Sequence, residues 1–171
     1  MSEITEITEM KEVTEQAPVN YAGFWIRFVA VVIDSLVLSF LSFMLIFPLL
    51  GLIGFSSLNF SDLSAMDEEE ILMTIFAIST PLYLANAIMT WLYYALLQSG
   101  SWQATLGKRA IGVKVVDKNG ERISFTTASV RYLGRIISGM TMLIGFIIAG
   151  FSAKKQALHD LIASTYVIYS K

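Results

Sequence analysis

The sequence contains no cysteine, one histidine and three prolines among its 171 residues. The absence of cysteine excludes a disulfide framework, a zinc–thiolate site and a thiol nucleophile. A single histidine, His159, excludes a metal site built from several histidines. No hydroxyl side chain has a recognisable general base beside it in the sequence. We therefore expect no catalytic residue, no metal and no cofactor, and we do not expect an enzyme.

A phosphate-binding loop is also missing, although the stretch GSWQATLGKR at residues 100–109 resembles one superficially. The phosphate-loop pattern has four residues between its glycines and a serine or threonine after the lysine. Here six residues separate the glycines, and Arg109 stands in place of the hydroxyl residue. We expect no nucleotide and no nucleic acid as partner. Lys108 and Arg109 are instead expected to face lipid phosphates at the membrane surface.

Charged residues are scarce, at 15% of the chain, whereas a soluble domain has about 25%. Five glutamates and one lysine fall within the first 20 residues, which lack the basic and apolar regions of a signal peptide. We predict that residues 1–19 form an acidic, disordered cytoplasmic tail. Residues 20–171 are predicted to form one membrane domain.

Long apolar runs are abundant, and a transmembrane helix needs about 20 such residues. Phe24 to about Ile46, with possible continuation to Ile53, and Ile71–Leu97 both qualify. A third segment, Val130–Phe151, contains two arginines and several glycines. It either spans the membrane or bends at Ser138–Gly139 into a re-entrant hairpin. The predicted fold class is a mainly α polytopic membrane protein.

The charges between the spans predict the orientation of the chain. Residues 55–70 carry five acidic residues and no basic one, whereas residues 98–135 carry seven basic and two acidic residues. Basic residues concentrate on the cytoplasmic side of membrane proteins. We therefore expect a multi-pass protein of the plasma (inner) membrane with a cytoplasmic N-terminus and an external 55–70 loop.

A small β structure is expected on the cytoplasmic side. Residues 111–125 alternate between apolar and polar side chains around Asn119-Gly120, which is a strong hairpin signal. A two-stranded hairpin is marginal alone. The stretch TYVIYS at residues 165–170 is β-branched and aromatic, so it could add a third strand.

Three stretches, YAGFWIRFVAVVID, TLGKRAIGVKVVDKNG and KKQALHDLIASTYVI, together resemble the RDD family of small bacterial membrane proteins. The family is named after one arginine and two aspartates, which the resemblance places at Arg27, Asp34 and Asp160. It covers residues 20–171. The resemblance implies a membrane protein, with ion or proton exchange as the suggested activity.

Asp34 is the residue on which a transport mechanism would depend. It lies ten residues beyond Phe24, which predicts a depth of about 15 Å, near the bilayer centre. An ionised carboxylate there costs about 2.5–3.5 kcal/mol, so it must be protonated, paired or hydrated. Asn86 is expected at a comparable depth on the second span, with Ser138 and Thr141 near. Asp34 and Asn86 therefore form either a candidate ion or proton site or a structural hydrogen bond between helices.

The second aspartate, Asp160, is expected to cap a helix or to pair with a basic residue. The candidate charge partners are Arg109, Arg131, Arg135 and the neighbouring His159. Arg27 either anchors the first helix at the membrane surface or binds a carboxylate such as that of Asp160.

Two functions from different classes follow from these features. The first is a small oligomeric exchanger of a monovalent cation or proton, because three segments are too few to enclose a path within one chain. The second is a non-catalytic membrane scaffold or regulator that binds another membrane protein. The expected partners are the lipid bilayer and either a second copy or another membrane protein.

Overall fold

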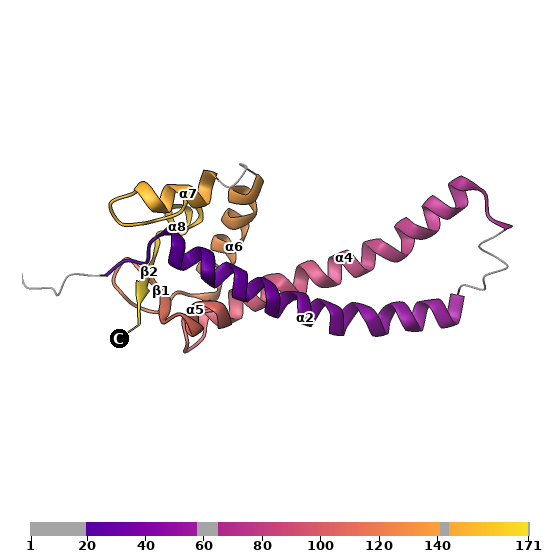
Figure 1. The fold of residues 1–171 in the computed structure, drawn as a ribbon, viewed down its shortest axis with the longest axis horizontal. Helices are drawn as coiled ribbons and strands as arrows, with labels where there is room; N and C mark the ends of the chain where they lie inside the picture. The colour runs from indigo at the N-terminus through magenta and orange to yellow at the C-terminus, as the bar shows by residue number, and fades with distance from the viewer. Residues whose placement is uncertain (1–19, 58–64, 141–143, 171) are drawn as a thin grey trace, which may run out of the picture.

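The computed structural model describes residues 20–57, 65–140 and 144–170. The predicted acidic tail, residues 1–19, lies outside this part of the chain. The described residues form a mainly helical fold with a small sheet (Figure 1). In chain order the elements are α2 (Phe24–Ser57), α4 (Glu68–Ser99), α5 (Leu106–Ala110), β1 (Val113–Asp117), α6 (Phe125–Met140), α7 (Ile144–Phe151), α8 (Leu158–Ile162) and β2 (Thr165–Tyr169).

The two long helices, α2 and α4, are long and apolar enough to cross a membrane, as the sequence predicts. They contain 34 and 32 residues, which corresponds to roughly 50 Å each at 1.5 Å per residue. Pro48 and Pro81 lie inside them without ending either helix. The side chain of Asp67 caps the start of α4 by accepting a hydrogen bond from the Glu70 backbone N–H at 2.9 Å.

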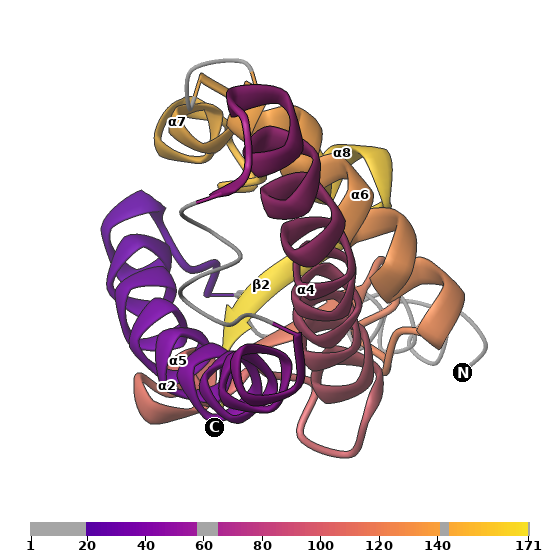
Figure 2. The same cartoon turned by 90° about the vertical axis from the view of Figure 1, so that its right-hand side faces the viewer.

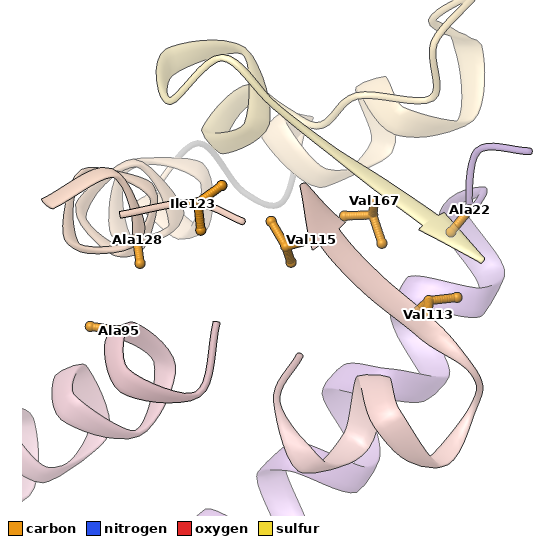
Figure 3. Close-up of a cluster of buried hydrophobic side chains, with 7 residues drawn as sticks. All are labelled: Ala22, Ala95, Val113, Val115, Ile123, Ala128 and Val167. Carbon is orange, nitrogen blue, oxygen red and sulfur yellow. The ribbon is translucent and has the colours of Figure 1, made fainter. Parts of the chain in front are cut away.

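All the other elements gather at one end of this helical pair, around the start of α2 and the end of α4 (Figures 1 and 2). We call this region the platform; it consists of residues 20–24 and 95–170 as far as they are described. Figure 3 shows its apolar core between β1, β2, α4, α6 and the start of α2. The core side chains are Ala22, Ala95, Val113, Val115, Ile123, Ala128 and Val167.

The sheet has two strands, and they are not the two arms of the predicted hairpin. β1 pairs antiparallel with β2, with Val115 opposite Val167. The C-terminal strand predicted at residues 165–170 is therefore present and pairs with the first arm. The start of the chain adds a single bridge between Tyr21 and Ile168 on the other side of β2.

The prediction of a second hairpin strand after the turn is wrong, because hydrogen bonds that cap the turn and the next helix lead the chain into α6. Gly120 has the positive φ expected of this turn, at +83°. The Asp117 carboxylate accepts hydrogen bonds from the backbone N–H groups of Asn119 and Glu121, each at 2.8 Å. The Ser124 hydroxyl then accepts from the Thr127 N–H at 3.1 Å, which is the geometry of a helix N-cap. Residues from Phe125 onwards consequently enter α6 instead of a strand.

The third apolar segment forms two helices, α6 and α7, where a plain span would be one continuous helix. A Cβ atom built on Gly145 would lie 2.8 Å from the Ser138 side chain, so α7 is folded back against α6. Ser138 and Gly139, the predicted position of the bend, lie inside α6, which ends at Met140, and α7 begins at Ile144. Within the described residues, the candidate spans are α2 and α4.

Candidate functional site

The first signature aspartate, Asp34, joins three parts of the chain through its carboxylate. Only 1% of this residue is exposed. One carboxylate oxygen accepts hydrogen bonds from the Tyr93 hydroxyl at 2.7 Å and from the Gly107 backbone N–H at 2.8 Å. The other accepts from the Thr105 hydroxyl at 2.7 Å. Asp34 thereby connects α2 to α4 and to the first turn of α5.

Gly107 permits this arrangement because α5 approaches α2 more closely than a side chain would allow. A Cβ atom at position 107 would overlap the Ala30 carbonyl oxygen and would lie 2.9 Å from the Asp34 carboxyl carbon. Thr105 is at the same time the N-cap residue of α5 and accepts a hydrogen bond from the Lys108 N–H. The TLGKR stretch is therefore a turn that binds a carboxylate of its own chain.

Asn86 does not join Asp34, which corrects the predicted polar layer. The Asn86 amide donates to the Ser42 hydroxyl at 3.2 Å and accepts from the Thr90 hydroxyl at 3.3 Å. It precedes Tyr93, the actual partner of Asp34, by two helical turns, or about 10 Å. The prediction failed because it assumed that both helices enter the membrane at the same level. Of the other expected contributors, Ser138 lies on α6, and Thr141 lies outside the described residues.

The second signature aspartate, Asp160, is completely buried and binds two arginines. One oxygen accepts from the Arg27 guanidinium and from the Ala157 backbone N–H, the latter at 3.1 Å. The other accepts two hydrogen bonds from Arg131, one of them from Nε at 2.9 Å. His159 Nε2 lies 3.4 Å from this second oxygen.

Arg27 binds the carboxylate of Asp160. This is the second of its two predicted roles, the first being an anchor at the membrane surface. Its Nε donates to the Ala22 carbonyl at 2.9 Å, and its Nη2 donates to the Lys155 carbonyl at 2.6 Å. Together with Asp160, these contacts tie the start of α2 to the segment that leads into α8. Arg27 and Asp34 lie on one helix but belong to separate clusters.

Of the three arginines proposed as charge partners of Asp160, the structure brings only Arg131 to it. Arg109 is exposed and stacks over the Trp102 ring at 3.8 Å. Arg135 stacks over the Tyr94 ring at 4.2 Å.

Burial and neighbouring charges shift the pKa values in this second cluster. Burial alone would raise the pKa of the Asp160 carboxyl, but the charges of Arg131 and Arg27 hold that pKa well below its usual range. Burial lowers the pKa of His159 well below its ordinary value, and the charge of Arg131 lowers it further. Burial also lowers the pKa of Lys108, again with a contribution from Arg131. Asp160 is therefore ionised and His159 is neutral at pH 7.

A small cavity of about 20 Å³ lies beside the Asp160 cluster, between α4, α5, α6 and α8. Its lining residues are Tyr94, Gln98, Lys108, Arg131, Tyr132, Arg135 and His159. Lys108 is buried here, contrary to the expectation that it faces lipid phosphates. The sequence alone gave no reason to place Tyr93, Thr105 or Gly107 beside Asp34, because the segment after α4 must first fold back onto α2.

The model of the RDD family matches residues 21–164. The chain belongs to the RDD family. Among its relatives in Bacillus subtilis (strain 168), the uncharacterized protein YxaI is 38% identical over 149 residues, covering 86% of this chain and 97% of that protein. The uncharacterized membrane protein YteJ is 34% identical over 153 residues, covering 88% and 82%.

No solved structure matches this RDD chain. Family membership and the two long apolar helices together support membrane association of the chain. Asp34 bonds α2 to α4 and α5, and we call these contacts the Asp34 joint. Asp160 bonds Arg27 at the start of α2 to Arg131 on α6, which forms a second joint. Both joints lie where the platform meets the long helices.

Proposed function

We propose that this RDD protein is a non-catalytic membrane scaffold or regulator, which anchors its platform through α2 and α4 and assembles with a second copy or another membrane protein. The proposal rests on the burial and the hydrogen bonds of two carboxylates, those of Asp34 and Asp160. Asp34 and Asp160 are at most 1% exposed, and their oxygens accept hydrogen bonds from donors on separate segments. Carboxylates used in this way hold a structure together.

The lengths of the charge-free segments support a membrane position in which Asp34 lies at the edge of the hydrocarbon core. Residues 35–57 of α2 and 71–98 of α4 contain no charged side chain. From Ile71 to Tyr93, α4 rises about 33 Å, close to the hydrocarbon thickness of about 30 Å. The level of Asp34 and Tyr93 would then be one boundary of the core, and the platform would lie at the membrane surface.

The basic residues of the platform support a cytoplasmic location for it. Because the chain has no cysteine, single introduced cysteines can test this topology without background. A cysteine at Ser57 should react with an impermeant thiol reagent in intact cells, and one at Ser124 should react only after the membrane is opened. The reverse labelling would overturn the orientation.

Contacts between the long helices support assembly with further helices. α2 and α4 cross near the platform in Figure 1, and both views show their other ends apart (Figures 1 and 2). Ser42, Asn86 and Thr90 form a partly buried polar cluster between them. Polar side chains in membrane helices promote helix association. A homo-oligomer or a complex with another membrane protein would cover this region.

A second candidate function, exchange of a monovalent cation or proton, is favoured by one property of Asp34. Among the described residues, its three hydrogen-bond donors are neutral, and no basic side chain forms an ion pair with it. A carboxylate whose charge is not matched by a cation could exchange a proton or bind a cation. Such an exchanger would need oligomers to enclose a path.

One reconstitution experiment separates the two functions. The full chain is placed in liposomes with a pH gradient, and the decay of the gradient is recorded after addition of sodium or potassium. The scaffold proposal predicts the same decay as in empty liposomes for the wild type and for Asp34→Asn. Cation-dependent decay that is present in the wild type and lost in a folded Asp34→Asn variant would establish exchange and refute the scaffold.

Assembly is measured on the same preparation by native mass spectrometry in mild detergent. The scaffold proposal predicts a homo-oligomer or a co-purifying membrane protein, with Asn86→Leu shifting the distribution toward the single chain. A protein that is monomeric in gentle extraction, and free of any partner, would contradict it.

A further inference from the structure

The cavity beside the Asp160 cluster is lined by more positive than negative charge. Lys108, Arg131 and Arg135 line it, from α5 and α6. The nearest carboxylate, Asp160, is already bound by Arg27 as well as by Arg131. The carboxylate of Asp34 is occupied by Tyr93, Thr105 and Gly107. Three basic side chains therefore line this cavity, and the one carboxylate beside it is shared by two arginines.

Lys108 is the most informative of these residues. It is only 8% exposed, and it belongs to the α5 turn that Asp34 fixes in place. Among the described residues, none provides a hydrogen-bond acceptor or a carboxylate for its ammonium group; its one recorded hydrogen bond is made by its backbone N–H. Lys108 lines the cavity, and bringing an ammonium group out of water is costly unless it gains a partner. An anion bound in the cavity would supply an acceptor that the described residues do not provide.

Arg135, which lines the cavity from α6, points to the same kind of ligand. Its guanidinium stacks on the Tyr94 ring, and it forms no ion pair with the described residues. An arginine held flat on an aromatic ring keeps its N–H groups available at its edge, where they match the oxygens of a phosphate. Tyr94 and Tyr132, which also line the cavity, are further sources of hydrogen-bond donors.

We propose that this cavity binds a phosphate-type oxyanion, held by Lys108 from α5 and by Arg131 and Arg135 from α6. The volume of about 20 Å³ has room for one or two oxygen-sized atoms, so it accepts the end of a phosphate group and excludes a nucleotide base or sugar. The phosphate is either inorganic or part of an anionic lipid headgroup, which the position of the platform beside the two spans makes accessible. The site does not depend on whether the protein transports ions.

The test compares Lys108→Met with Arg109→Gln in the full-length protein. Both variants lose one positive charge from adjacent positions of α5, but Arg109 is exposed and stacks on Trp102, away from the cavity lining. Inorganic phosphate is titrated against protein in uncharged detergent, at constant ionic strength, and binding is followed by calorimetry. In parallel, protein from nanodiscs containing phosphatidylglycerol or phosphatidylcholine is analysed for retained lipid by native mass spectrometry.

We expect Lys108→Met to weaken binding about tenfold or more, whereas Arg109→Gln binds like the wild type. Arg135→Gln provides a second variant, with the same expected loss, in case Lys108→Met is poorly folded. Binding of inorganic phosphate that follows this pattern identifies a free anion as ligand. Retention of phosphatidylglycerol alone, with the same pattern, identifies a lipid headgroup. Binding of neither ligand, or equal binding by the Lys108 and Arg109 variants, would overturn the proposal.

Ligand-free stability gives an independent reading of the same site. If the Lys108 ammonium group gains its partner only from a bound anion, it contributes no stabilising contact when ligand is absent. Lys108→Met should then unfold at the same temperature as the wild type, or higher, without inorganic phosphate and with phosphatidylcholine as the only lipid. Added ligand should then raise the unfolding temperature of the wild type and of Arg109→Gln only. A lower unfolding temperature of Lys108→Met without ligand, together with an unchanged response to ligand, would show that Lys108 only supports the packing.

Discussion

Replacement of Gly107 by alanine is the sharpest test of the Asp34 joint, since it adds one methyl group and changes no charge. The added Cβ atom would overlap the Ala30 carbonyl oxygen, which is backbone and cannot rotate away. It would also lie 2.9 Å from the Asp34 carboxyl carbon. α5 must therefore move away from α2, and the hydrogen bond from the Gly107 N–H to Asp34 must lengthen or break.

The expected cost combines two effects. Overpacking of a closed site destabilises a protein by about 1–3 kcal/mol. Loss of a hydrogen bond to a buried charged group costs about 1.5–3 kcal/mol, although partial relaxation means that the two do not add fully. Alanine gains roughly 1 kcal/mol over glycine through its helix propensity, which offsets part of the cost. We expect a net loss of about 2–3 kcal/mol, or roughly 5–10 °C in the unfolding temperature of a chain of this size.

The matched control is Gly139→Ala. Gly139 also lies in a helix, and an added Cβ there meets nothing within 4 Å. This variant should unfold at the wild-type temperature or slightly above it when both are measured by circular dichroism in the same detergent. If Gly107→Ala is as stable as Gly139→Ala, α5 does not contact α2 as described, and the proposed role of Asp34 as a joint loses its support.

The remaining predictions concern the sheet, the Asp34 joint and the Asp160 cluster. Cysteines introduced together at Val115 and Val167 should form a disulfide on mild oxidation, because the two residues are directly opposite; a chain that keeps two free thiols after oxidation would contradict the register. Tyr93→Phe removes one donor to Asp34 and should cost about 1–3 kcal/mol of unfolding free energy in denaturant titrations; no loss would mean that this hydrogen bond is dispensable. The lowered pKa of His159 means that, below about pH 6.5, the unfolded chain binds a proton that the native chain does not, so stability should fall toward pH 5 by up to about 1.4 kcal/mol per pH unit. His159→Asn should flatten this dependence, and an unchanged slope would assign it to another group.

The candidate spans α2 and α4 could be predicted from the sequence because their signal is local and needs no knowledge of partners. A run of about 20 apolar residues suffices to predict a membrane helix. The same locality explains why Asn119-Gly120 predicts a turn, which the structure contains with Gly120 at positive φ. It also explains the failure after that turn, since the hairpin signal in the sequence does not include the competing N-cap at Ser124, whose hydrogen bond starts α6.

The two aspartate clusters were predictable only in part because their partners are distant in the chain. Asp34 is separated from Thr105 by 71 positions and from Tyr93 by 59. A depth estimate along one helix therefore selected Asn86, which is a plausible partner only if both helices enter the membrane at equal levels. Arg131 could be predicted as a candidate partner of Asp160 because charged residues are only 15% of the chain. A buried carboxylate therefore has few basic side chains with which it can pair.

The position of the signature residues explains why a membrane protein of this size uses buried charges at all. Between helices in lipid, burial of apolar surface supplies no net driving force, because lipid tails are as apolar as the side chains. Orientation of a platform against two spans must then come from directional contacts. Arg27 supplies them through three separate nitrogens, which bind Asp160 and the carbonyls of Ala22 and Lys155. A lysine has one ammonium group in place of this planar fork and could not hold the same three acceptors in place, so the arginine is required by the geometry of the joint.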